Sequence, residues 1–125
     1  MEALPDLVEP RNHAQGILLP DGKAIIWGGA SHGNNGLKGS FSSELFDPYS
    51  NTSVRQDDLQ YARGYHSAAA LLPSGKVLAT GGIDGPLEKT MEIYSPPYLF
   101  MGARPVMTSS RPTERLSGLG PINTR

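Results

Sequence analysis

The segment with the strongest potential for chemistry is Arg63-Gly64-Tyr65-His66-Ser67, in which a phenol and an imidazole stand side by side. Successive side chains of a regular strand point to opposite faces, so Tyr65 and His66 could reach one ion only at a strand entrance or a bulge. An imidazole combined with oxygen ligands suits Cu(II). The alternative is structural: a buried tyrosine that fills the core and a histidine that bonds to the backbone.

The Tyr65–His66 step introduces one of two closely similar stretches of the chain. Residues 66–82 read HSAAALLPSGKVLATGG, and residues 13–29, 53 positions earlier, read HAQGILLPDGKAIIWGG. Self-similarity at a fixed period is typical of repeat folds, and a period of about 50 residues indicates a kelch-type propeller. His13 occupies the position of His66, but Asn12 stands where Tyr65 does. We therefore interpret His13 as structural or as a substrate-rim residue.

Each stretch predicts a β-hairpin, because two short apolar runs flank a Pro-x-Gly turn and a pair of glycines ends the second run. Shorter strand-like runs follow each hairpin. The paired glycines, Gly28-Gly29 and Gly81-Gly82, are expected to allow close approach of neighbouring backbone. The expected strands are Ala14–Leu19, Lys23–Trp27, Glu44–Asp47, Ser53–Arg55, Ser67–Leu72, Lys76–Thr80, Met91–Tyr94 and Arg104–Thr108.

The composition of the chain favours an all-β fold and excludes several classes of function. Its 125 residues include 15 glycines and 11 prolines, which suits short strands joined by turns. The net charge of −1 leaves no electrostatic basis for a nucleic-acid or membrane partner, and no apolar run has the length of a membrane span. The absence of cysteine excludes disulfides and thiolate chemistry within the chain.

Several other residues have a simple interpretation. Trp27 ends a strand and is expected in the core, while His32 and the pair Asp57-Asp58 are expected in solvated loops. Arg63 could hold a substrate or a carboxylate, or form a surface ion pair. Asn51-Thr52-Ser53 fits the acceptor pattern for N-glycosylation, in a turn that we expect to be exposed.

A wider set of motifs resembles the galactose oxidase and glyoxal oxidase family. In order, the motifs are Arg-Gly-Tyr-His-Ser, Leu-Leu-Pro-Ser-Gly-Lys-Val-Leu, Gly-Gly, Glu-Ile-Tyr-Ser-Pro-Pro-Tyr-Leu-Phe and Ala-Arg-Pro-Val-Met-Thr, and the resemblance covers roughly residues 10–125. It implies a kelch propeller followed by an immunoglobulin-like domain. We therefore expect residues 1–102 to form a partial kelch β-propeller of about two blades, and residues 103–125 to begin the immunoglobulin-like β-sandwich.

The resemblance also implies a chemistry for Tyr65 and His66. Enzymes of this family oxidise a primary alcohol or aldehyde with O2 and release H2O2 at a mononuclear copper. There a Tyr-His pair supplies an axial tyrosine, which takes a proton from the alcohol, and an equatorial histidine. Tyr65 and His66 match that pair. The other ligands, a second histidine and a radical-storing tyrosine cross-linked to cysteine, have no match here, so we expect copper in a full-length parent and no catalysis by this chain alone.

The expected partners follow from the incomplete propeller. About two blades cannot close a propeller, so the rest of a propeller or a second copy of the chain should cover the open faces. Small alcohols, aldehydes or carbohydrates and O2 are the implied substrates, in a secreted or extracellular setting, although residues 1–10 lack the features of a signal peptide. Because propellers host many functions, a non-catalytic kelch module that binds protein or carbohydrate stays the alternative.

Overall fold

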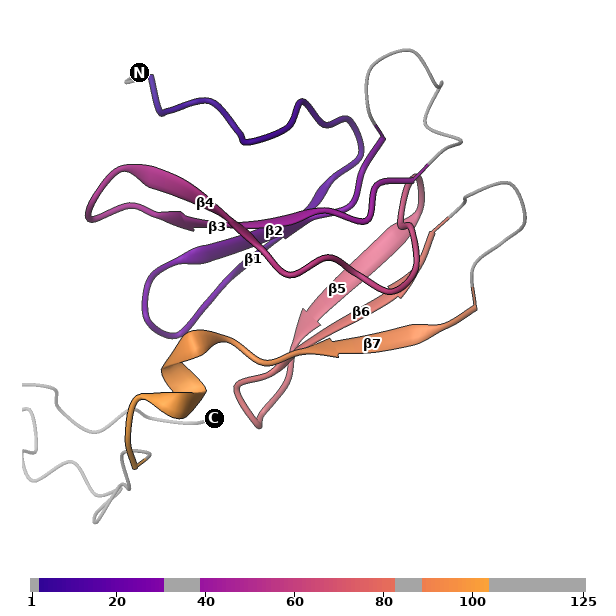
Figure 1. The fold of residues 1–125 in the computed structure, drawn as a ribbon. Coiled ribbons are helices and arrows are strands. Elements are labelled where there is room, and N and C mark those ends of the chain that lie inside the picture. The colour runs from indigo at the N-terminus through magenta and orange to yellow at the C-terminus, as the bar shows by residue number, and fades with distance from the viewer. Residues whose placement is uncertain (1–2, 31–38, 83–88, 104–125) are drawn as a thin grey trace, which may run out of the picture.

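The computed structural model describes residues 3–30, 39–82 and 89–103, which form two antiparallel β-sheets (Figure 1). The first sheet, in the order β1-β2-β3-β4, contains β1 (Gln15–Leu18), β2 (Ala24–Trp27), β3 (Ser43–Asp47) and β4 (Thr52–Gln56). The second, in the order β5-β6-β7, contains β5 (Ser67–Leu71), β6 (Val77–Gly81) and β7 (Met91–Tyr94). A short 3-10 helix, η1 (Pro97–Phe100), follows β7.

The expected all-β class and the strands of both hairpins are confirmed, with small differences at their ends. The predicted strand at residues 104–108, and all but the first residue of the expected second domain at 103–125, lie outside the described residues. No helix in the described part of the chain has the length and apolar character needed to cross a membrane.

The two hairpin turns have the geometry that the Pro-x-Gly signals predict. In the first turn, the Gly22 amide donates to the carbonyl of Leu19 at 2.9 Å, and Gly22 has a φ of 84°. In the second turn, the Gly75 amide donates to the carbonyl of Leu72 at 2.8 Å, and Gly75 has a φ of 77°. Glycine accepts these positive φ angles without the steric cost of a Cβ, so the local sequence fixes both turns.

The sheets approach each other most closely along their first strands. Among the described strands, β1 and β5 are the only pair from different sheets whose backbones come into contact. An apolar core lies between the sheets, and Trp27 is 1% exposed, which confirms the expected core position of this residue. The buried members of the core are Leu19, Ile25, Trp27, Leu45, Val77 and Ala79.

A buried arginine and a buried glutamate join the N-terminal segment to the first sheet. The Arg11 Nε donates to the Oε1 of Glu44 on β3 at 2.9 Å, and the Arg11 Nη1 donates to the carbonyl of Gly28 at 2.7 Å. The backbone amide of Val8 donates to the Oε2 of Glu44 at 2.8 Å, and the Ser53 hydroxyl donates to the same oxygen at 2.6 Å. The carboxylate of Glu44 is therefore satisfied although it is fully buried.

The second sheet repeats this network with different residues. The Arg63 Nη2 donates to the Oε2 of Glu92 on β7 at 2.8 Å, and the Arg63 Nη1 donates to the carbonyl of Gly81 at 2.8 Å. The backbone amide of Gln60 donates to the Oε1 of Glu92 at 2.6 Å. Arg63 is 0% exposed and its guanidinium binds a carboxylate, so the expectation that it holds a carboxylate is confirmed, whereas the alternatives of a surface ion pair and of a substrate-holding group are wrong.

The paired glycines allow the close backbone approach that the sequence predicts. Gly28 and Gly29 have φ angles of 61° and 83°, and the Gly29 amide donates to the carbonyl of Arg63 at 2.8 Å. A Cβ on Gly28 would overlap that same carbonyl oxygen, and a Cβ on Gly29 would lie 2.6 Å from the carbonyl oxygen of Asn12. These contacts hold the loop before β5 against the end of the first sheet.

Candidate functional site

Tyr65 and His66 lie at the entrance of β5 and not within the regular strand. The amide of Ser67, the first residue of β5, donates to the carbonyl of Gly64 at 3.3 Å and closes a tight turn around the pair. His66 has a φ of 62°, a left-handed conformation that few non-glycine residues adopt. The strict alternation of a strand therefore does not apply here, and the two side chains can lie on the same side.

The backbone just before this turn is tied to the first sheet. The Arg63 amide donates to the carbonyl of Ser40 at 3.1 Å, while the Arg63 carbonyl accepts from Gly29. Its guanidinium binds Gly81 and Glu92 of the second sheet, so Arg63 is fixed at both its main chain and its side chain. The residues that follow are thus presented from a rigid base, which is what a binding or catalytic site requires.

The ring of Tyr65 contacts two imidazoles. It stacks on His66 with ring centroids 3.7 Å apart and an interplanar angle of 28°. It also meets His13 edge to face, with centroids 4.8 Å apart and an interplanar angle of 71°. Tyr65 is 38% exposed, so the alternative in which this tyrosine fills the core does not hold.

The contact between His13 and Tyr65 is a feature that the sequence interpretation missed. His13 has a φ of 56°, close to that of His66, and each histidine comes shortly before the first strand of its sheet. The matching positions of the two histidines in the two copies are visible in the sequence. The contact itself depends on the approach of β1 to β5, which no local pattern predicts.

The donor atoms of this cluster are one phenol oxygen and the imidazole nitrogens of His13 and His66. Such a set suits a borderline ion, Cu(II) above all, better than a hard cation such as Mg²⁺. Within residues 3–30, 39–82 and 89–103, no group of three or more His, Asp or Glu side chains gathers as around a metal ion. His32, expected in a solvated loop, lies outside the described residues.

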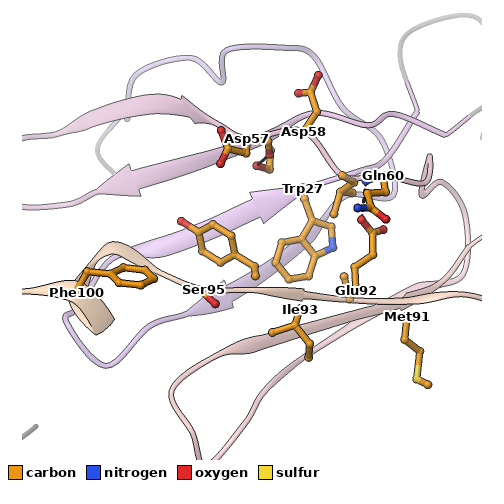
Figure 2. Close-up of a pocket in the computed structure, with 13 residues that line it drawn as sticks. Trp27, Asp57, Asp58, Gln60, Met91, Glu92, Ile93, Ser95 and Phe100 are labelled. Carbon is orange, nitrogen blue, oxygen red and sulfur yellow. Dashed lines mark hydrogen bonds between the residues drawn. The ribbon is translucent and has the colours of Figure 1, made fainter.

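A separate cavity of about 550 Å³ lies between the sheets (Figure 2). Trp27 lines it, and the Trp27 Nε1 has no hydrogen-bond partner within the described part of the chain. Glu92 also lines it, but its carboxylate is engaged by Arg63 and Gln60. Asp57 and Asp58 lie exposed at its rim, as expected for a solvated loop. The cavity therefore lacks a convergent set of free reactive groups.

Comparison with known proteins finds relatives that include an aldehyde oxidase and a galactose oxidase. No family model matches the chain. An aldehyde oxidase of Arabidopsis thaliana is 32% identical over 112 residues, which cover 77% of this chain and 18% of the relative. A galactose oxidase of Gibberella zeae is 30% identical over 120 residues, which cover 86% of this chain and 18% of the relative.

A WSC domain-containing protein of Arthroderma benhamiae is 34% identical over 97 residues, covering 69% of this chain and 10% of the relative. Among solved structures, a fungal alcohol oxidase of the AA5 family, in complex with copper, superposes with a TM-score of 0.66 at 26% identity. That match covers 77% of this chain and 21% of the oxidase. The chain thus spans 10% to 18% of the length of these three sequence relatives.

Proposed function

This chain belongs to the galactose oxidase and glyoxal oxidase family, and from that premise we propose that it contributes part of the active site of a copper-dependent oxidase. The reaction is the oxidation of a primary alcohol or aldehyde by O2, with release of H2O2. In this proposal Tyr65 and His66 are copper ligands, and Tyr65 is also the catalytic base. The observation that carries it is the half-exposed Tyr65 stacked on His66 at the entrance of β5.

The architecture that we propose is a partial kelch propeller. Two features support it: the first strands of the two sheets lie closest together, as neighbouring blades do around a central axis, and the Arg-Glu network recurs in both sheets. Residues 1–102 would then supply about two blades, and residues 103–125 would begin an immunoglobulin-like domain. The entrance of β5 would face the axis, where a shared site can form.

The roles of the side chains follow from their chemistry. A phenolate can accept a proton from an alcohol, whereas a neutral phenol cannot, and in this proposal a cation beside the Tyr65 Oη would favour the phenolate. His66 would bind the same cation through an imidazole nitrogen and fix its distance from Tyr65. Bound copper would supply the Lewis acid and one of the two electron-accepting centres.

The electron balance explains why the proposal needs more than this chain. Oxidation of an alcohol to an aldehyde removes two electrons and two protons, and both pass to O2 to give H2O2. One copper accepts one electron, and the second one-electron store used in this family is a tyrosine cross-linked to cysteine. The chain has no cysteine. We therefore propose that the remaining ligands and the radical store come from outside residues 1–125, in a secreted protein.

The test is the substitution Tyr65→Phe in the longer oxidase that the proposal requires. Loss of the base should lower the rate of peroxide formation by about 10²-fold to 10⁴-fold, with the circular dichroism spectrum unchanged. Tyr49→Phe is the matched control, because Tyr49 is 82% exposed in the turn between β3 and β4, at the far end of the strands. Unchanged activity in Tyr65→Phe would remove the role given to this residue.

A second measurement separates the oxidase from a non-catalytic binding module. Cu(II) should bind to the isolated chain weakly, and His66→Ala should weaken this binding further, as measured by electron paramagnetic resonance titration. A longer protein that takes up no copper and oxidises no alcohol or aldehyde would favour the module that binds protein or carbohydrate.

A further inference from the structure

The turn between β3 and β4 carries a sequence signal that the oxidase proposal does not use. Asn51-Thr52-Ser53 is an Asn-x-Ser triplet, and no other asparagine of the chain has serine or threonine two positions later. Oligosaccharides are attached to such triplets on proteins that enter the secretory route. The chain therefore offers one candidate asparagine, and its use depends on how the turn presents it.

The structure places Asn51 at an exposed corner of that turn. The backbone is held by the Asp47 Oδ1, which accepts from the amides of Tyr49 at 2.9 Å and Ser50 at 3.4 Å. Asn51 itself is exposed and has a φ of 54°, a conformation that asparagine tolerates better than most residues. Substitution of its amide nitrogen would displace no core residue.

An exposed aromatic ring stands two positions before the asparagine. Tyr49 is 82% exposed, although a tyrosine ring offers a large apolar surface. Its hydroxyl lies beside the β1–β2 turn, where a Cβ on Gly22 would come within 2.9 Å of it. The ring is thus set against the neighbouring turn while most of its surface stays in solvent. The C–H face of a sugar is the kind of flat, weakly polar surface that packs on such a ring.

We propose that Asn51 is an N-glycosylation site and that Tyr49 packs against the first sugar of the glycan. In the covalent step, the Asn51 Nδ2 forms a bond to the anomeric carbon of an oligosaccharide donor. The bond from that carbon to a lipid diphosphate breaks, the diphosphate leaves, and the amide loses one proton. No oxidation or reduction is involved, so the inference does not depend on copper or on the role of Tyr65.

The structure also indicates when the transfer takes place. The Ser53 hydroxyl, which the acceptor triplet requires, donates to the buried Glu44 Oε2 at 2.6 Å in the folded chain. Because this bond engages the hydroxyl in the folded chain, the proposal places the transfer before β4 pairs with β3. The turn lies at the opposite end of the strands from the entrance of β5 (Figure 1), so the glycan leaves Tyr65 and His66 accessible.

The first experiment is translation of residues 1–125, fused to a cleavable secretory leader, in the presence of microsomes. This assay needs no folded protein. We expect one discrete increase in mass that endoglycosidase removes, its loss in Asn51→Gln and Ser53→Ala, and its retention in Ser53→Thr and in the control Asn12→Gln. Protection from added protease shows that the chain has been translocated. If the protected chain shows no increase in mass, the proposal that Asn51 is glycosylated is wrong.

A second experiment tests the role of Tyr49 in the glycosylated, secreted chain. Enzymatic removal of the glycan should lower the midpoint of thermal unfolding in the wild type and in Tyr49→Phe, because both keep an aromatic ring. In Tyr49→Ala the glycosylated and the deglycosylated protein should have the same midpoint of thermal unfolding. If glycan removal lowers the midpoint of Tyr49→Ala as much as that of the wild type, Tyr49 does not pack on the sugar.

Discussion

Two buried arginines stabilise the two sheets in the same way. Arg11 binds Glu44 and the carbonyl of Gly28, and Arg63 binds Glu92 and the carbonyl of Gly81. Each guanidinium thus joins the segment before a sheet to the third strand and to the glycine pair at the end of the second strand. A guanidinium suits this task because it is planar and its several N–H donors can bind a carboxylate and a carbonyl at the same time. The ammonium group of lysine lacks this fixed planar arrangement of donors.

The first prediction concerns the charge of Arg63. Arg63→Met should lower the free energy of unfolding by about 3–5 kcal/mol, because it leaves the Glu92 carboxylate without its buried counter-ion. The measurement is urea unfolding of the 125-residue chain followed by the fluorescence of Trp27, its one tryptophan, which lies in the core.

The matched control for this prediction is Arg55→Met. The Arg55 side chain is 50% exposed and pairs with Glu9 and Asp58 at the surface, where solvent screens such pairs, so little change is expected. Equal loss of stability in Arg63→Met and Arg55→Met would contradict the importance assigned to the buried pair.

The second prediction concerns the response of Glu44 to acid. Burial by itself raises the pKa of this carboxyl, but hydrogen bonds from Ser53, Val8 and Arg11 outweigh burial and leave the pKa below its usual value. The unfolded chain, with a glutamate pKa of about 4.3, therefore binds a proton more readily than the folded chain. The stabilisation is complete above that pH and is lost as the pH falls through the lower pKa of the folded state.

The test compares the wild type with Glu44→Gln across this range of pH. At pH 6 the variant should unfold at lower urea, because its glutamine leaves the charge of Arg11 buried and unbalanced. As the pH falls from about 5 to below 4, the difference in free energy of unfolding between the two proteins should shrink. A difference that stays constant with pH would show that Glu44 does not contribute through its charge.

At the scale of the strands, the paired glycines position the loop that carries Tyr65. The Gly28 amide donates to the carbonyl of Ser42 at 3.1 Å, and the Gly29 amide donates to that of Arg63 at 2.8 Å. Both glycines have positive φ, so this corner needs residues without a Cβ. The end of the β1–β2 hairpin and the entrance of β5 are thereby tied together.

The third prediction is that Gly28→Ala disturbs this corner. A Cβ would overlap the Arg63 carbonyl, and the left-handed conformation adds strain of about 1–3 kcal/mol. Gly16→Ala on β1 is the control, because its Cβ would meet only the Cγ1 of Ile26 at 4.0 Å, an ordinary contact. The measurement is the urea midpoint from Trp27 fluorescence. A midpoint for Gly28→Ala as high as that for Gly16→Ala would contradict this account.

The strands show which parts of the fold can be predicted from sequence. The hairpins are encoded locally, since each Pro-x-Gly turn and its flanking apolar runs lie within a few residues of one another, and both hairpins formed as predicted. The position of Tyr65 and His66 at a strand entrance was likewise one of the arrangements the sequence allowed. For Arg63 the sequence allowed a bound carboxylate but could not say which one, because its partners, Gly81 and Glu92, come much later in the chain and meet it only in the tertiary structure.

At the scale of the whole molecule, the two sheets leave one broad surface without a described partner. The register places alternate residues of the second sheet on the face away from the first sheet. Met91 and Ile93 on that face are 69% and 50% exposed. The residues of this outer apolar face are Ala68, Ala70, Leu78, Met91 and Ile93. A neighbouring blade would cover such a face in the proposed propeller, whereas the isolated chain exposes it to water and to other copies.

The last prediction is therefore that the isolated chain self-associates through the outer apolar face, and that Ile93→Lys weakens the association. A lysine at this position keeps its charge in water in the monomer but would carry it into an apolar contact in the dimer, which is unfavourable. Val54→Lys is the control, because Val54 is similarly exposed at 56% but lies on β4, in the other sheet. Sedimentation velocity over a range of concentrations should show a shift toward monomer for Ile93→Lys and none for Val54→Lys. A wild-type chain that stays monomeric at every concentration would mean that this face needs no partner, and the argument that a larger propeller covers it would fail.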